Sequence, residues 1–145
     1  MNTTITVDDV YDALGALPGA QPDPHRTGSS DVALAAATTD PTMIETWVLA
    51  RVFWLRRDRP TAVFVSATVT FADDEISGWM AAYSDVPVTD CGTAVDAAAA
   101  AQGLAEELVA MVNEGARLAR DGRLAEAVQY AQAHRIAFHP AAVSA

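Results

Sequence analysis

Lysine is absent from the 145 residues, so all nine basic side chains are arginines. This excludes Schiff-base lysines, lysine general bases and the lysine of a phosphate-binding loop. Cys91 is the only cysteine, which excludes an intrachain disulfide and a cysteine metal cluster. No apolar run reaches the roughly 18 residues that a membrane-spanning helix needs, and no secretory signal opens the chain. We therefore expect a cytoplasmic protein, or part of a particle assembled in the cytoplasm, with no membrane partner.

Positive charge is also scarce. Nineteen acids face nine bases, for a formal net charge of −10. Such a surface repels phosphate backbones, so direct nucleic-acid binding is not expected, whereas docking onto a basic partner fits the charge. Half of the residues are hydrophobic (51%), which is enough for a real core. The length fits one domain spanning residues 1–145.

Recognisable catalytic motifs are missing as well. There is no Gly-rich phosphate loop, no nucleophile elbow and no CxxC pair. His134 and His139 are five residues apart, whereas two zinc ligands on one helix need a spacing of three or four. The acidic run 73–75 is typical of a turn in water. The sequence predicts no metal, no cofactor and no catalytic residue, and it favours a protein that is not an enzyme.

The N-terminal part predicts one helix followed by an irregular loop. Thr6 and Asp9 have the spacing of a capping box, and apolar residues then recur at helical intervals up to Leu17. Pro18 ends this helix. Residues 18–30 are rich in proline and glycine, which predicts a loop.

The middle of the chain contains the clearest strand and two ambiguous segments. Apolar residues alternate over 61–71, the period of a half-buried strand. Asp40-Pro41 is a strong helix start, so we expect a helix over 40–55, with a strand over 47–55 as the alternative. Residues 72–83 fit a helix or a strand paired back on 61–71. A linker is expected over 84–92.

The C-terminal part predicts two antiparallel helices, at about 93–120 and 123–137. Thr93 and Asp96 form a second capping box, and Gly122 can take the left-handed conformation that ends a helix. A short tail over 140–145 follows. The expected fold is therefore α+β: a small antiparallel sheet around 61–71, packed against helices, with a C-terminal helix hairpin.

Residues 108–140 resemble a single tetratricopeptide unit. The matching positions are Gly115, Leu118, Gly122, Leu124, Ala127 and Tyr130. In that family the inner helix face binds peptides, so the resemblance implies a role in protein–protein assembly. Candidate partner-binding residues in this region are Asn113, Arg117, Tyr130 and His134.

Two further clusters occupy the middle third. The first is a basic island with Arg51, Arg56 and Arg57 as candidate partner-binding residues, which could bind a partner's acids or the protein's own. The second is aromatic, and we expect it to be core packing rather than a ligand pocket. Its members are Trp47, Phe53, Trp54, Phe64, Phe71, Trp79 and Tyr83.

The leading functional hypothesis is a non-enzymatic interaction protein, a small acidic subunit or adaptor of a larger cellular or phage assembly, which binds a protein partner or its own copies. One alternative is an inhibitor or immunity-type protein that covers a basic active site. The other is a small-molecule-binding or isomerase-like domain, which requires a concave pocket with a buried carboxylate or histidine.

Overall fold

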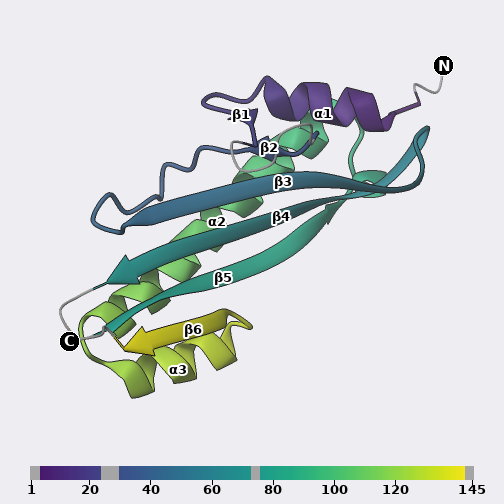
Figure 1. The fold of residues 1–145 in the computed structure, drawn as a ribbon. Coiled ribbons are helices and arrows are strands. Elements are labelled where there is room, and N and C mark those ends of the chain that lie inside the picture. Colours follow the sequence, from purple (N-terminus) through teal and green to yellow (C-terminus); the bar gives the residue numbers. More distant parts are fainter. Residues whose placement is uncertain (1–3, 24–29, 73–75, 143–145) are drawn as a thin grey trace.

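The computed structural model describes residues 4–23, 30–72 and 76–142, and within them six strands form one antiparallel sheet (Figure 1). Each strand pairs with the next along the chain, so the order in the sheet is the order in the sequence. The strands are β1 (Gln21–Pro22), β2 (Val32–Ala33), β3 (Glu45–Arg56), β4 (Arg59–Ala72), β5 (Ile76–Pro87) and β6 (Ala137–Ala142). The helices are α1 (Val7–Gly15), α2 (Ala94–Arg120), α3 (Leu124–Ala133) and the short 3-10 helix η1 (Val88–Asp90). The predicted α+β class is confirmed.

Helix α1 begins at the predicted capping box. The Thr6 hydroxyl accepts a hydrogen bond from the Asp9 amide at 3.1 Å, and the Asp9 carboxylate accepts one from the Thr6 amide at 3.0 Å. Both orphan amides at the helix start are thereby satisfied. The apolar face of α1 is fully buried at Val7, Val10 and Leu14.

The helix predicted over 40–55 is wrong, because residues 45–56 form strand β3. Cross-strand pairing with β4 runs from Glu45 opposite Thr70 to Phe53 opposite Ala62. Aromatic and β-branched residues favour this ladder, and it outweighs the local helix signal at Asp40. The Asp40 carboxylate instead accepts the Thr42 amide at 2.9 Å in a local turn.

Strand β5 settles the ambiguity over 72–83 in favour of a strand, for the residues described. It also corrects the linker expected over 84–92, since β5 continues to Pro87 and η1 follows. Gly78 lies in this strand opposite Pro140 of β6. A Cβ at this position would lie 2.4 Å from the carbonyl oxygen of His139. Glycine is therefore needed for the β5–β6 pairing.

The predicted helix pair is confirmed, with Gly122 at φ +81° in the turn between α2 and α3. The second helix ends at Ala133, four residues before the predicted end at 137. Arg135 then takes a positive φ of 56°, and β6 pairs with β5. The expected tail over 140–145 is therefore strand up to residue 142, and residues 143–145 lie outside the described part.

All three α-helices lie on one side of the sheet. The long helix α2 packs on β4 and β5, and both α1 and α3 contact α2. Figure 1 shows α2 running behind the strands. The core between α2 and the sheet is built from small residues. On α2 they include Ala97, Ala98, Ala101, Ala105, Val109, Val112, Ala116 and Ala119.

Candidate functional site

The sheet has a covered face and an open face. On β4, Val63, Val65, Ala67, Val69 and Phe71 are buried toward α2, which defines the covered face. The alternate residues of each strand point the other way and define the open face. No described helix packs on this second face. Most of the described side chains on it are half-buried or exposed, whereas Ala62 and, opposite Leu49, Ala33 are buried.

Three aromatic rings meet at one end of the open face, each on a different strand. Phe53 on β3 lies 5.3 Å from Phe64 on β4, between ring centroids, and Phe64 lies 5.4 Å from Tyr83 on β5. Phe53 is 46% exposed and Tyr83 is 66% exposed. The cluster stabilises the sheet by cross-strand contacts while most of its outer surface meets water.

Two tryptophans occupy the other end of the same face. Trp47 on β3 is half-buried, and Trp79 on β5 is 39% exposed. The Trp79 ring stacks on His139 of β6 at 3.9 Å between centroids. Ser66 and Thr68 lie between the two aromatic ends, on the central strand β4. Large residues on β3 and β5 thus border small hydroxyl residues on β4, which lies between them.

An ion pair lies at the β2 side of the open face. The Arg51 guanidinium donates to both carboxylate oxygens of Asp31, with the shortest contact at 2.7 Å. The Asp31 side chain is 5% exposed and that of Arg51 is 38% exposed. The hydrogen bonds that Arg51 donates to the Asp31 carboxylate raise the pKa of Arg51. The charge of Arg51 is therefore locally neutralised.

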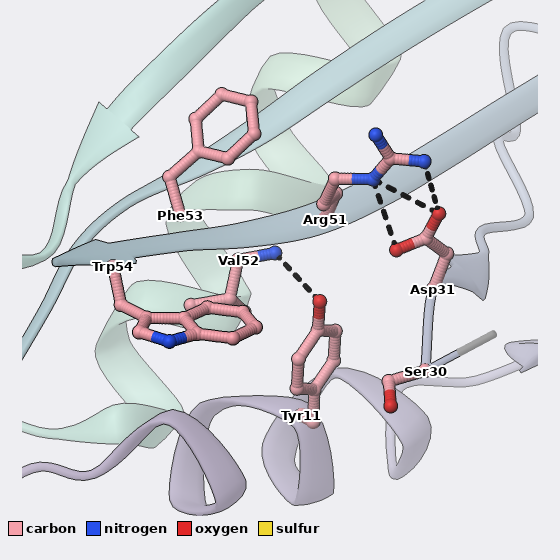
Figure 2. Close-up of a pocket in the computed structure, with 7 residues that line it drawn as sticks. All are labelled: Tyr11, Ser30, Asp31, Arg51, Val52, Phe53 and Trp54. Carbon is pink, nitrogen blue, oxygen red and sulfur yellow. Dashed lines mark hydrogen bonds and ion pairs between the residues drawn. The ribbon is translucent and has the colours of Figure 1, made fainter. Parts of the chain in front are cut away.

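A hollow of about 420 Å³ adjoins this pair (Figure 2). Figure 2 shows Phe53 and Trp54 on opposite sides of β3, with Tyr11 rising from α1 toward the strand. The Val52 amide donates to the Tyr11 hydroxyl oxygen at 3.0 Å. Burial raises the pKa of Tyr11. The remaining lining residues are Ser30, Asp31 and Arg51.

The structure places Asn113 and Arg117 in a polar seam between α2 and residues 35–43. The Asn113 side-chain amide is fully buried and donates to the Thr38 carbonyl at 2.9 Å. Arg117 pairs with Asp40, also at 2.9 Å. Both predicted partner-binding residues thus have intrachain roles.

Glu106 extends this seam on the same face of α2, about two turns before Asn113. Its carboxylate accepts the backbone amides of Ala37 at 2.7 Å and of Thr38 at 2.9 Å. These backbone hydrogen bonds, from Ala37 first, lower the pKa of Glu106. No local sequence pattern predicts this contact, because the partners are 68 and 69 residues apart in the sequence.

The other predicted candidates are scattered. Tyr130 and His134 stack on each other on α3, at 4.1 Å between ring centroids. Arg56 pairs with Asp58 in the β3–β4 turn. Arg57 pairs with Asp8 at 2.7 Å and lies over the Trp54 ring. The structure does not bring the seven candidates together, and of them Arg51 alone lies beside the open aromatic face.

The expectation that the aromatic cluster is core packing is wrong for four of its members. Phe53, Trp54, Trp79 and Tyr83 are among the exposed large hydrophobic residues, whereas Phe71 is fully buried. The missed signal is the period-two alternation of 47–53 once that segment is taken as a strand. It puts Trp47, Leu49 and Phe53 on one face and Val48, Ala50 and Val52 on the other.

Comparison with known proteins gives no relative: no family model, no curated protein and no solved structure matches this chain. Among the described residues, no helix is long and apolar enough to cross a membrane. Within the same ranges, no group of three or more His, Cys, Asp or Glu side chains is placed to hold a metal ion.

Proposed function

We propose that this chain is a non-enzymatic interaction protein that binds a protein partner through the open face of its sheet. The role fits a small acidic subunit or adaptor of a larger assembly, acting in the cytoplasm or in a particle assembled there. The observation that carries the proposal is the composition of that face. An antiparallel sheet with one face in water normally alternates apolar inside with polar outside, and this one places large aromatic residues outside. They are Trp47, Phe53, Phe64, Trp79 and Tyr83.

The size of these side chains supports a role of the open face in binding. Covering one exposed aromatic side chain removes apolar surface that is worth about 1.5–3 kcal/mol when fully buried. Trp and Tyr are also the residues that most often dominate binding energies at protein interfaces. Phe53, Phe64 and Tyr83 are held together by ring contacts, so little conformational freedom is lost when a partner covers them.

Site-specific photo-crosslinking in the producing cells tests this proposal. A photoreactive phenylalanine replaces Tyr83, which is 66% exposed on the open face, or Val95, which is 69% exposed on α2. We expect a discrete crosslinked protein from position 83 and none above background from position 95. Equal yields at both positions, or no crosslink at either, would contradict the proposal.

A second candidate function is small-molecule binding in the hollow shown in Figure 2. The observation that favours it is the buried Asp31 carboxylate in a wall that also holds Tyr11 and Trp54. A screen of small aromatic and polar molecules by NMR tests it. Shifts at Trp54 that are lost in Tyr11→Phe would support this function, and a screen without shifts at these residues would contradict it.

A further inference from the structure

The charges on the open face are few and mostly negative. The charged residues in its described part are Glu45, Arg51 and Asp85, together with the titratable His139. Arg51 is neutralised by its bidentate contact with Asp31. What remains is a weakly acidic aromatic face on a chain of net charge −10.

This negative charge bears on which of two partners binds the open face, a second copy of the chain or a basic protein. A second copy of the chain would bring another net charge of −10 against the first, and would place two weakly acidic faces together. Like-charge juxtaposition is unfavourable, whereas a cationic partner is attracted and steered to the surface. Electrostatics therefore favours a basic partner over self-association.

The arrangement of side chains indicates the shape of that partner. The distance along β4 from Phe64 to Thr70 is about 20 Å, since each strand residue advances about 3.3 Å. Along this line the middle of β4 contributes the small residues Ser66 and Thr68, while Trp79 and Tyr83 flank it on β5. A helix is about 10 Å wide, and 14 residues span about 21 Å. An amphipathic helix laid along β4 thus contacts both aromatic ends.

Resting on the proposed function above, we propose that the partner is a basic amphipathic helix. Its apolar stripe packs on the open face, while its Lys and Arg side chains meet Asp85 and Glu45 at the two ends of that face. This mode is helix recognition by an apolar surface, with charge providing specificity. The helix would occupy the same position on the open face that α2 occupies on the covered one.

Binding of designed peptides tests the proposal by fluorescence anisotropy. The probe is a labelled peptide of about 18 residues with Leu and Trp at i, i+3, i+4 and i+7 and with Lys and Arg elsewhere. One control replaces every Lys and Arg with Glu, and another shuffles the order so that no apolar stripe remains. We expect the basic helix to bind at least about tenfold more tightly than either control, and to weaken several-fold between about 50 and 300 mM salt.

Two pairs of protein variants locate the binding. Tyr83→Ser is expected to weaken the basic peptide about tenfold, while Val95→Ser, with similar exposure on α2, leaves binding unchanged. Asp85→Asn and Glu107→Gln each remove one negative charge from an exposed site, on the open face and on α2 respectively. We expect weaker binding of about two- to threefold from Asp85→Asn alone. Equal effects within either pair would overturn the proposal, because attraction to the whole acidic chain would then explain the binding.

Failure of this inference can be separated from failure of the proposed function. Basic and acidic peptides that bind equally would overturn the cationic partner, and a crosslinked protein at position 83 would then leave the interaction function standing. Sedimentation should give a monomer. A dimer that Tyr83→Ser dissociates would assign the open face to a second copy and would also overturn the basic helix.

Discussion

The two faces of the sheet are built from residues of opposite size. The covered face presents mainly valine and alanine to an alanine-rich helix, whereas the open face presents tryptophan, tyrosine and phenylalanine to solvent. Small side chains allow α2 to approach the sheet closely, and at Gly115 there is no room for a side chain. A Cβ there would lie 2.6 Å from the sulfur of Met80 on β5. Close packing thus excludes large aromatic side chains from most of the core, and most of them lie on the other face.

The largest expected difference between the faces comes from two phenylalanines on the same strand. Phe71 is fully buried on the covered face and Phe64 is half-buried on the open one. Phe71→Ala should lower the free energy of unfolding by about 3–5 kcal/mol, because it leaves a cavity in the core. Phe64→Ala should lower it by about 1–2 kcal/mol, since it loses mainly ring contacts with its neighbours. Urea unfolding measures both changes. Equal decreases in the free energy of unfolding would show that Phe64 is packed as tightly as a core residue, so that the second face of the sheet is not exposed to solvent.

Two glycines of α2 give a smaller contrast. Gly115 faces the sheet, whereas a Cβ at Gly103 has no neighbour within 4 Å. Gly103→Ala should raise the free energy of unfolding by about 0.5–1 kcal/mol through helix propensity. Gly115→Ala should lower it by about 1–2 kcal/mol, because the crowding of Met80 outweighs that gain. Thermal unfolding of both variants measures the two changes in stability. Stabilisation by both would mean that α2 can move away from the sheet at no cost.

How much could be predicted from the sequence depended on whether the signal was local. The Thr6 capping box, the Gly122 turn and the alternation of 61–71 are short-range patterns, and all three are found in the structure. For residues 40–55 the sequence favours a helix over the alternative strand, because Asp40-Pro41 resembles a helix start. The conformation of β3 is instead decided by its pairing with β4. A local rule cannot weigh a ladder that forms with a segment elsewhere in the chain.

The candidate site was missed for a related reason. Whether Phe53 or Tyr83 is core or surface depends on which sheet face α2 covers. The alternation of 47–53 separates the two faces of the strand, but it does not say which of them a distant helix covers. For two residues of the polar seam, the sequence indicates binding to a partner, whereas the structure shows contacts within the chain. The sequence indicates Asn113 and Arg117 as candidate partner-binding residues, yet they bind Thr38 and Asp40, which lie more than 70 residues away in the sequence.

Low pH should destabilise the polar seam that joins α2, on the covered face of the sheet, to residues 35–43. Hydrogen bonds from Thr42, and then the contact with Arg117, lower the pKa of Asp40 from 3.8 to about 2. The carboxylate therefore stabilises the fold fully above pH 3.8, and this contribution is lost as the pH falls through about 2. Asp40→Asn should lower the free energy of unfolding at pH 7 by about 1 kcal/mol or less and flatten the acid dependence below pH about 4. Asp58→Asn, at an exposed ion pair, is the control, and an identical acid profile in the two variants would contradict the role of Asp40.

The smallest effect on stability is expected on the open face itself. Tyr83 is 66% exposed and its ring contacts Phe64 from one side, so Tyr83→Ser should change the free energy of unfolding by less than about 1 kcal/mol. The same substitution should clearly reduce the fluorescence of a dye such as ANS, which binds exposed apolar surface, whereas Val95→Ser should not. If Tyr83 served folding alone, its replacement would lower the free energy of unfolding and leave dye binding unchanged. The opposite pattern is the one expected of a surface whose aromatic residues act in recognition, because their removal leaves the covered face and its packing intact.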